Sequence, residues 1–445
     1  MNLMNEFFSF AWSIKDSNYS FIHRLNAKKE LNYNRKALDE LTLSRLKKIV
    51  DYASKKSVFY KKIFKEYSVS SESLKRIDDL EMFPFLTRDH LRDSINDVVT
   101  QRIDLSKWNK RATGGTTSSP VEFYCNRNAL WKKNAFSHEI DQWYGKYTGC
   151  KSVFLWGAPQ DFPAKQSFGM RLRNYTYQRS LMLPSSPLDD KIMEDYYVKL
   201  NNWKPEFLQA YPTPLYEFCL YLKKNKLKLP YLKSASVTAE PLLSYHRITI
   251  EEVLGFKIFN WYGSRELSRV ASECEIHDGL HINEPCVYVE IVPDSELPEG
   301  YGHLVVTDLL NYATPFIRYR TGDIAAFKNE TCPCGKSLRM LSKIEGRTAD
   351  VILLPNGRKI PGVSLTNRII KGFDEFVELQ IIQKNYLNFV VKYVKGRSFS
   401  NSSLDNFVIK LCEFFDIKVK VEFVEVKKLD REKSGKVRFV KNEMV

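Results

Sequence analysis

The chain has 445 residues, of which 43% are hydrophobic and 13% are aromatic. This length suits two or three domains with buried cores, and the composition is too apolar for a disordered chain. No uninterrupted apolar run approaches the roughly 18 residues of a membrane-spanning helix, and the first residues lack the positive region of a signal peptide. The sequence therefore predicts a globular, cytoplasmic protein.

The charge is strongly positive, with 68 Lys and Arg against 53 Asp and Glu. Such an excess can attract nucleic acid, anionic lipid or a phosphate-bearing ligand. The basic residues lie in scattered pairs such as Lys132-Lys133 and Lys427-Lys428, and no zinc-finger spacing, basic zipper or RNA-recognition signature accompanies them. We interpret them as a solvated surface, expect no nucleic-acid partner, and expect at most peripheral contact with a membrane.

Residues 1–110 show patterns typical of helices. In one of them the apolar residues lie near the spacing of one helical face, namely Leu41, Leu46, Ile49, Val50 and Ala53. From about residue 150 to 350, short apolar runs such as SVFLWG, FLQAYP and VYVEIV alternate with helical stretches. This alternation favours an α/β arrangement, with functional loops at the strand ends.

The pattern changes after about residue 347. EFVELQII, YLNFVVKYV and IKVKVEF are typical of strands, and LDNFVIKLCEFF places Leu404, Phe407, Val408, Leu411 and Phe415 on one helical face. We therefore predict an N-terminal domain over 1–347, mainly helical over 1–110, and an α+β domain over 348–445.

The sharpest local feature is a run of small and hydroxylated residues closed by a proline, Thr113-Gly114-Gly115-Thr116-Thr117-Ser118-Ser119-Pro120. Such a run cannot pack a core, but it can bend around a ligand and direct N–H groups and hydroxyls at phosphate oxygens. It is not a Walker loop, because the spacing and lysine of that motif are absent. We interpret it as an anion cradle; the alternative is a surface loop.

Four further segments combine a glycine with a charged side chain. Glu266 follows Gly263 after a predicted strand, where a carboxylate can hold Mg²⁺ beside phosphate. Asp323, behind a glycine, can accept both hydroxyls of a ribose, although a surface turn also explains it. The other two segments are 345–350, where the composition changes, and Ser434-Gly435-Lys436, which a solvated tail also explains.

In this order the five segments resemble the adenylate-forming superfamily of acyl-CoA synthetases, peptide-synthetase adenylation domains and luciferases. Within it the chain is similar to phenylacetate-CoA ligase and its relatives encoded with capsule-polysaccharide genes, since it reads SVTAEPL, FNWYGSRE, ASEC, GLHIN, GHLVVTDL, PFIRYRTGD, CPCG and IEGR in succession. The resemblance covers nearly the whole chain. It implies a large, multi-layered α/β N-terminal domain and a small, mobile α+β lid.

The resemblance also implies which residues bind ATP. The phosphate loop would be Thr113, Gly114, Gly115, Thr116, Thr117 and Ser118, closed by Pro120. Ala239, Glu240 and Pro241 would line the adenine pocket, and Tyr262, followed by Gly263 and Ser264, would cover the adenine or the substrate. Asp323 would hold the ribose with Arg347 assisting.

The same resemblance assigns the catalytic groups. Glu266 would bind Mg²⁺, Lys436 would reach the carboxylate and the α-phosphate, and the hinge of the lid would be Ala349 or Asp350. The acid attacks the α-phosphorus of ATP, so two anions meet there. The positive charges of the Mg²⁺ at Glu266 and of Lys436 are needed at that point.

The sequence departs from the family pattern at two places. The phosphate loop lacks the glycine common after its paired threonines, and Val121 stands where many members have a lysine. Arg265 stands where most members have a threonine, so the contact to the α-phosphate falls to Arg265 or to no residue.

A second constellation comprises Cys274, His277, His281, Cys332 and Cys334. Thiolates with an imidazole suit tetrahedral Zn²⁺, and Cys332-Pro333-Cys334 supplies two ligands from one turn. The resemblance favours Cys274, His281, Cys332 and Cys334 as the ligands, with His277 as the alternative to His281. The other reading is reduced cysteines in a core beside solvated histidines.

The predicted activity is ATP-dependent conversion of a carboxylic acid into an acyl-adenylate, followed by transfer to CoA, to an amine or to a hydroxyl on a sugar. Cell-surface polysaccharide biosynthesis is the expected setting, and an aryl- or acyl-CoA ligase is the alternative. A non-catalytic binding protein that kept the fold is the rival of another class. The acid should lie near Trp156-Gly157, Tyr211-Pro212 and Ala239.

Overall fold

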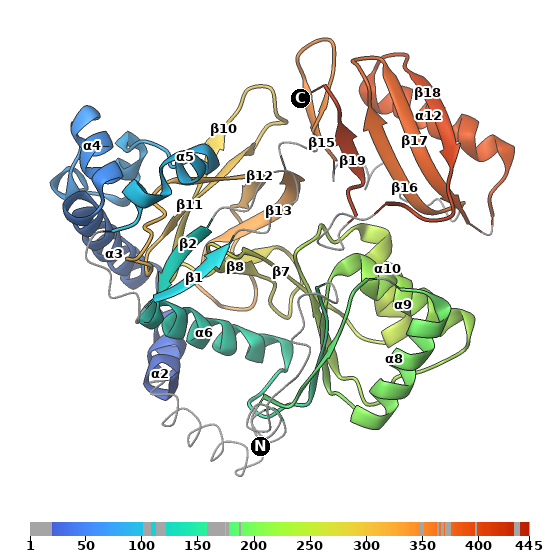
Figure 1. Cartoon of the computed structure of the whole chain (residues 1–445), viewed down its shortest axis with the longest axis horizontal. Coiled ribbons are helices and arrows are strands. Elements are labelled where there is room, and N and C mark those ends of the chain that lie inside the picture. The colour runs from blue at the N-terminus through green and yellow to red at the C-terminus, as the bar shows by residue number, and fades with distance from the viewer. Residues whose placement is uncertain are drawn as a thin grey trace.

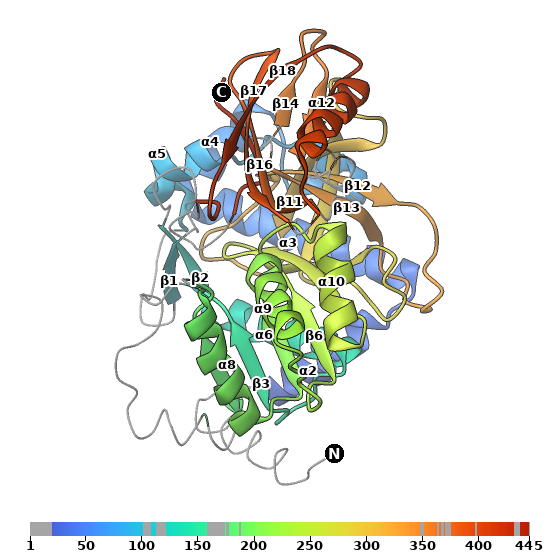
Figure 2. The same ribbon diagram turned by 90° about the vertical axis from the view of Figure 1, so that its right-hand side faces the viewer.

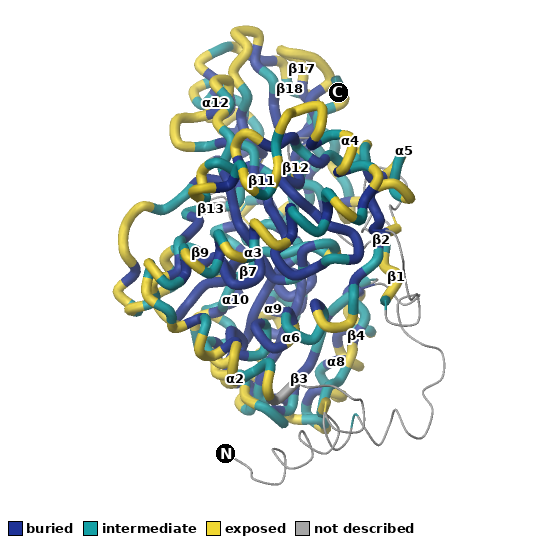
Figure 3. Tube along the Cα trace, turned by 90° about the vertical axis from the view of Figure 1, so that its left-hand side faces the viewer, coloured by how far each residue is buried: buried dark blue, intermediate teal, exposed yellow. Residues whose placement is uncertain are grey.

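The computed structural model describes residues 20–100, 108–112, 122–157, 174, 178–186, 188–347, 351–362, 365, 369, 375–396, 398–430 and 437–444. They form a larger body and a smaller C-terminal unit, drawn in orange to red, that lies over helix α10 in both ribbon views (Figure 1, Figure 2). The buried parts of the chain run through the centre of the body, and exposed segments lie mainly at its edges (Figure 3). Among the helices of these residues, none is long and apolar enough to cross a membrane.

The body begins with helices, as the sequence predicts. They are α2 (Ser20–Leu31), α3 (Arg35–Lys56), α4 (Val58–Glu66) and α5 (Arg88–Val98), with the short 3₁₀ helices η1 (Ser71–Ser73) and η2 (Ile77–Met82).

Polar side chains set the helix boundaries. The side chain of Asn34 accepts a hydrogen bond from the amide of Ala37 and begins α3. Ser57 ends α3 and, by accepting a hydrogen bond from the amide of Tyr60, also begins α4. The predicted face of α3 is buried except for Leu41, which is half-buried.

Eleven strands of the described residues form one sheet, in the order β10-β11-β12-β13-β9-β8-β7-β6-β5-β3-β4. Their bounds are β3 (Ser152–Leu155), β4 (Ser180–Leu183), β5 (Phe207–Ala210), β6 (Ser234–Val237), β7 (Phe259–Ser264), β8 (Ser268–Ser272), β9 (Leu280–Ile282), β10 (Val287–Pro293), β11 (Tyr301–Asp308), β12 (Tyr319–Lys328) and β13 (Met340–Arg347).

The sheet changes character at β7. From β4 to β7 neighbouring strands are parallel, whereas from β7 to β10 they are antiparallel. The parallel part is connected through α8 (Asp190–Trp203), α9 (Pro212–Lys224) and α10 (Ser244–Leu254), which lie together on one side of it (Figure 1). Parallel strands need such crossover helices, and the predicted α/β class is confirmed.

A separate hairpin precedes α6 (Arg127–Asp141) and the 3₁₀ helix η4 (Gln142–Tyr144). Its strands are β1 (Trp108–Ala112) and β2 (Glu122–Asn126), and they pair from Trp108 opposite Asn126 to Ala112 opposite Glu122. The run predicted to form the phosphate loop therefore connects the two strands, although it lies outside the described residues.

The C-terminal unit has the predicted α+β composition. A four-stranded sheet has the order β18-β17-β16-β19, with bounds β16 (Phe376–Gln383), β17 (Asn388–Lys395), β18 (Lys420–Glu425) and β19 (Val440–Asn442). Helix α12 (Asn401–Phe415) buries Phe407, Leu411 and Phe415 in the same core as this sheet. The hairpin of β14 (Val351–Leu353) and β15 (Lys359–Pro361) precedes it. The domain boundary after residue 347 stays a prediction.

The C-terminal unit docks on the body through an apolar cluster beside α10. Leu243 of the body packs with Leu429, Val437 and Phe439, each of which is at most 8% exposed. Nearby, the ammonium group of Lys428 donates to the carbonyl of Leu188 over 3.1 Å. The contact is thus an apolar patch with a polar margin.

Candidate functional site

The hairpin between β7 and β8 presents the predicted cation ligand. A Cβ atom at Gly263 would lie 2.2 Å from the carbonyl oxygen of Ser268, so only glycine allows the strands to approach this closely. The amide of Leu267 donates to the hydroxyl of Ser264 over 3.2 Å and tightens the turn. Arg265 at its tip is exposed and Glu266 is half-buried, so both can meet a ligand.

The structure brings together the residues predicted to cover the adenine and to hold the ribose. The hydroxyl of Tyr262 donates to Oδ2 of Asp323 over 2.5 Å. Burial, reinforced by the negative charge of Asp323, raises the pKa of the Tyr262 hydroxyl well above its ordinary value. Tyr262 therefore remains a hydrogen-bond donor throughout the physiological pH range.

The backbone around Asp323 is fixed by its neighbours. Gly322 has a φ of 80°, which favours glycine, and the amide of Asp323 donates to the hydroxyl of Thr321 over 3.1 Å. Asp323 lies opposite Arg347 in the pairing of β12 with β13, as expected for two residues that share a ligand. The side chain of Arg347 lies outside the described residues.

The residues predicted to line the adenine and acid pockets follow three parallel strands. Trp156 follows β3, Tyr211 follows β5 and Ala239 follows β6, so all three lie at the carboxyl edge where ligands of α/β sheets bind. The rings of Trp156 and Tyr211 are 4.6 Å apart between centroids. The two rings thus form an aromatic wall at the carboxyl edge of the parallel strands.

The turn after β6 is held in an unusual backbone conformation. Ala239 has a φ of 72°, which is uncommon for a residue with a Cβ atom and costs energy. The carboxylate of the next residue, Glu240, is 8% exposed and accepts a hydrogen bond from the amide of Thr213 over 3.2 Å. This contact ties the turn, which Pro241 continues, to the beginning of α9.

Several predicted residues lie outside the described ranges. They are Thr113, Gly114, Gly115, Thr116, Thr117, Ser118 and Pro120 of the phosphate loop, Ala349 and Asp350 of the hinge, and Lys436. Their roles stay predictions.

An ion-pair cluster that the sequence does not predict connects the hairpin of β7 and β8 to α6. The guanidinium of Arg269 on β8 pairs with Asp141 at 2.7 Å and lies over the ring of Trp261 at 4.6 Å from its centroid. Burial opposes ionisation of Asp141, but the charges of Arg269 and Lys146 outweigh it and lower the pKa of Asp141 to about 2. The cluster fixes β7 and β8 against α6.

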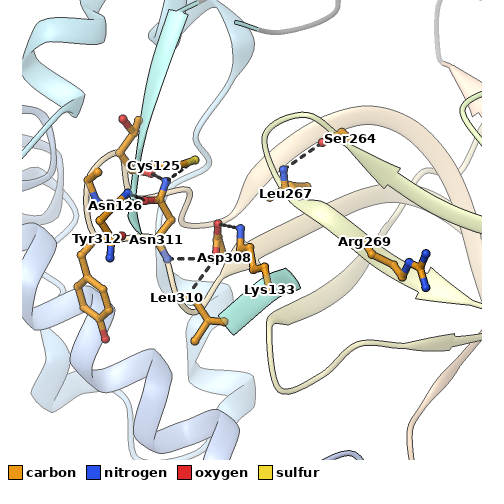
Figure 4. A network of polar contacts seen from close by, with 12 residues as sticks. Cys125, Asn126, Lys133, Ser264, Leu267, Arg269, Asp308, Leu310, Asn311 and Tyr312 are labelled. Atoms are coloured by element: carbon orange, nitrogen blue, oxygen red, sulfur yellow. Dashed lines mark hydrogen bonds and ion pairs between the residues drawn. The ribbon is translucent and has the colours of Figure 1, made fainter. Parts of the chain in front are cut away.

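A second buried pair corrects the interpretation of Lys132-Lys133 as a solvated pair. The ammonium of Lys133 is 2.5 Å from Oδ2 of Asp308, and both side chains are almost fully buried. Oδ1 of Asp308 accepts hydrogen bonds from the amides of Leu310 and Asn311 (Figure 4). A helix turns each consecutive residue by about 100°, so adjacent lysines face different surroundings, and only Lys132 remains half-exposed.

The predicted cysteine and histidine constellation forms a compact cluster. One ligand atom each from Cys274, His281, Cys332 and Cys334 lies within 4.8 Å of the others. The sulfurs of Cys274 and Cys332 are 3.6 Å apart, and the sulfur of Cys334 is 3.2 Å from Nε2 of His281. Two sulfurs on one tetrahedral zinc, at about 2.3 Å each, would be about 3.8 Å apart.

The orientation of His281 also fits metal binding. Its Nδ1 faces the carbonyl of Leu338 at 3.4 Å, and burial lowers the pKa of the imidazole. A neutral ring that donates from Nδ1 directs the lone pair of Nε2 at Cys334, which is the arrangement of a metal-binding histidine. The ring of Trp143, which no sequence signal indicated, packs against His281 with centroids 6.0 Å apart.

His277, the alternative ligand, is not part of the cluster. Its Nδ1 is 3.3 Å from Oε2 of Glu273, and its ring packs on Phe259. His277 has a φ of 57°, an uncommon left-handed backbone conformation, and it is absent from the group of four ligand atoms. Of the two histidines, only His281 lies with the three thiols among the described residues.

Known proteins resemble this chain in sequence over most of its length. Residues 352–443 match the model of the CapK C-terminal domain. The chain is 26% identical over 413 residues to Protein CapK of Staphylococcus aureus, covering 91% of this chain and 89% of that one. It is 27% identical over 339 residues to the phenylacetate-coenzyme A ligase of Thermus thermophilus, covering 72% of each chain. The chain is therefore similar in sequence to adenylate-forming ligases over most of its length.

Solved structures show the same fold. A crystal structure of 2-hydroxyisobutyryl-CoA ligase in the postadenylation state, in complex with 2-HIB-AMP, superimposes with a TM-score of 0.77 at 21% identity, covering 94% of this chain and 92% of that one. The same ligase with 2-HIB-AMP and CoA in the thioesterification state gives 0.62. The chain thus resembles the phenylacetate-CoA ligase and CapK branch in sequence and an acyl-CoA ligase in fold, as the sequence analysis predicts.

Proposed function

We propose that the ligase converts a carboxylic acid and ATP into an acyl-adenylate and pyrophosphate, and then transfers the acyl group to an acceptor in cell-surface polysaccharide biosynthesis. The main observation in favour of adenylate formation is the hydrogen bond between Tyr262 and Asp323, next to the turn that holds Glu266. The nucleoside of ATP would lie against Tyr262 and the segment 239–241, with its ribose on Asp323. The acid would lie against Trp156 and Tyr211.

The position of the C-terminal unit on the body supports a lid orientation that suits the first step, adenylate formation. Val437, the neighbour of Lys436 in the chain, packs against Leu243, which is two residues after Pro241. The TM-score is also higher against the postadenylation state of 2-hydroxyisobutyryl-CoA ligase than against its thioesterification state.

The charges near the turn suit the chemistry of adenylate formation. Attack of a carboxylate on the α-phosphorus brings two anions together, and a cation there stabilises the transition state. Glu266 would hold Mg²⁺, which neutralises phosphate charge when it is bound. Arg265 is exposed at the same turn and would contact the α-phosphate, and Lys436 would neutralise the attacking carboxylate.

We further propose that Cys274, His281, Cys332 and Cys334 hold a structural Zn²⁺. The sulfur spacing and the tautomer of His281 support this assignment. The cluster joins the end of β8 with β9 and the segment before β13. The metal would therefore stabilise the antiparallel part of the sheet and take no part in the reaction.

The acceptor distinguishes two candidate functions. Similarity to CapK over 91% of the chain and the resemblance to relatives encoded with capsule-polysaccharide genes favour an amine or hydroxyl on a sugar. Similarity to phenylacetate-CoA ligases favours CoA, which would make the enzyme an aryl- or acyl-CoA ligase. A binding protein that lost activity is disfavoured, since Glu266 and Lys436 are both present.

The test has two stages. Pyrophosphate exchange into ATP is measured across a panel of aliphatic, aromatic and hydroxylated acids, which identifies the acid. The best acid is then supplied with CoA, with amino sugars and with sugar nucleotides, and the products are analysed by mass spectrometry. An acyl-sugar product supports the proposal, a thioester as the final product supports the CoA ligase, and no acid-dependent exchange contradicts both.

A further inference from the structure

A pocket of about 230 Å³ opens between α3, the beginning of α6 and the loop after β11. Its walls carry both apolar and polar side chains. The lining residues are Leu41, Ser44, Arg45, Lys48, Asn126, Asn128, Lys132, Leu309, Leu310 and Tyr312. Asn126, Leu310 and Tyr312 lie together beside the end of β2 (Figure 4).

The pocket holds an excess of positive charge. Arg45, Lys48 and Lys132 line it, and the carboxylate of Glu30 forms an ion pair with Arg45 at 2.9 Å. Three cations against one carboxylate leave two positive charges, and within the described residues neither Lys48 nor Lys132 forms an ion pair. Burial, together with the nearby charge of Arg45, lowers the pKa of the Lys132 ammonium.

The beginning of α6 adds to this positive field. The side chain of Asn126, the residue before the helix, does not cap it and instead accepts from the amide of Tyr312 over 3.2 Å. The amides of the first helical turn therefore lack that partner, and Asn128, in this turn, lines the pocket. Amides at the beginning of a helix favour an anion.

The pocket lies at the end of β2 opposite to the end that the predicted phosphate loop precedes in the chain. Asn126 ends β2, whereas the phosphate loop precedes the other end of that strand. From Glu122 to Asn126, four steps at about 3.3 Å each separate the two ends of β2 by roughly 13 Å.

We infer that this pocket binds the phosphate group of a small phosphorylated compound or inorganic phosphate itself. A phosphate dianion would balance the two unpaired cations, and Leu41, Leu309 and Tyr312 would contact a short carbon skeleton. The volume is below the roughly 300 to 1,000 Å³ of pockets for drug-sized ligands, which favours a ligand smaller than a nucleotide. The inference does not depend on the identity of the acid or of the acceptor.

The first experiment measures phosphate binding by calorimetry, with the nucleotide site saturated with AMP and with ionic strength held constant by chloride. The Kd of wild-type protein for phosphate is compared with those of Lys132→Gln and Lys48→Gln. Loss of one charge-assisted hydrogen bond should weaken binding roughly 10- to 100-fold. The matched control is Lys47→Gln, because Lys47 is exposed on α3 and does not line the pocket.

The second experiment separates a binding role of Lys132 from a structural one. If Lys132 serves a ligand, removal of its charge relieves repulsion with Arg45, so Lys132→Gln in phosphate-free buffer should melt at the same temperature as wild type or higher. A clear drop in melting temperature would show that Lys132 stabilises the fold and would overturn the inference. It would equally be overturned by phosphate binding that AMP abolishes, or by an unchanged Kd in both pocket variants.

Discussion

The hydroxyl of Tyr262 and the carboxylate of Asp323 share a hydrogen bond of 2.5 Å although 61 residues separate them in the chain. Tyr262 lies within β7, and Asp323 lies within β12. The bond therefore connects the hairpin of Glu266 with the strand that would hold the ribose. A change in either residue should be detected first in the binding of ATP.

Tyr262→Phe removes the donor while it preserves the ring. We expect the KM for ATP to rise about tenfold, which corresponds to loss of one hydrogen bond of about 1.4 kcal/mol, with a smaller change in kcat. Steady-state kinetics at several ATP concentrations measures both. Tyr386→Phe is the control, because Tyr386 is 48% exposed in the C-terminal unit.

The pH dependence sharpens this prediction. The pKa of Tyr262 is raised, so the hydroxyl keeps its proton across the range from pH 6 to 9. The ratio of the two KM values should thus stay constant over that range. A ratio that falls towards one at pH 9 would show that Tyr262 ionises and is not a permanent donor.

The pair of Asp141 and Arg269 should stabilise the fold in a pH-dependent way. The pKa of Asp141 in the folded protein is lowered to about 2 from an ordinary value of 3.8, so its stabilisation is present above pH 4 and is lost as pH falls through 2. The difference corresponds to about 2 kcal/mol. Asp141→Asn should therefore lower the free energy of unfolding by at least that amount at pH 7.

Urea unfolding at pH 7, 4 and 2.5 measures this effect. The difference between wild type and Asp141→Asn should shrink as the pH falls. Asp195→Asn is the matched control, since Asp195 forms an exposed pair with Lys199 and such pairs contribute at most about 1 kcal/mol. Equal losses in the two variants at pH 7 would contradict the role of the buried pair.

The proposed zinc site predicts a metal content. Purified protein should contain close to one equivalent of zinc, and Cys332→Ser should release it and lower the melting temperature, because the folded state alone offers all four ligands. Elemental analysis beside thermal denaturation measures both. Cys412→Ser, in α12 and away from the cluster, should retain the metal. Protein without zinc, prepared without chelators, would remove the assignment.

The docking of the C-terminal unit predicts a split between the two half-reactions. Phe439→Ala weakens the apolar cluster with Leu243 that supports the adenylation orientation. Pyrophosphate exchange should fall more than acyl transfer from a synthetic acyl-adenylate. Ile409→Ala, at an exposed position of α12, should change neither rate. Equal losses in both half-reactions would argue that the cluster only stabilises the fold.

Local patterns predicted much of this molecule. The strands around residues 208, 236 and 289, the helix that buries Phe407, and the placement of Glu266 after a strand all follow from periodicity and glycine positions. These features depend on neighbours in the chain, which is the range over which a sequence pattern carries information. The family resemblance added the expected roles.

Other features depend on contacts between distant segments and were not predicted. The sequence predicts a solvated Lys133, because a lysine pair has the same pattern whether its partner is water or Asp308, which is 175 residues away. The choice between His281 and His277 required the backbone turn at His277. The packing of Trp143 on the cysteine cluster likewise has no signal in spacing.

The most direct test of the proposed chemistry is acid-dependent pyrophosphate exchange in wild type, in Lys436→Ala and in Lys427→Ala. Lys436 would neutralise charge that is largest in the transition state, so its loss should slow exchange by about 10²- to 10³-fold with an unchanged melting temperature. Lys427→Ala, at an exposed position before the same segment, should leave the rate unchanged. If Lys436→Ala exchanges pyrophosphate as fast as wild type, adenylate formation by the proposed site is contradicted.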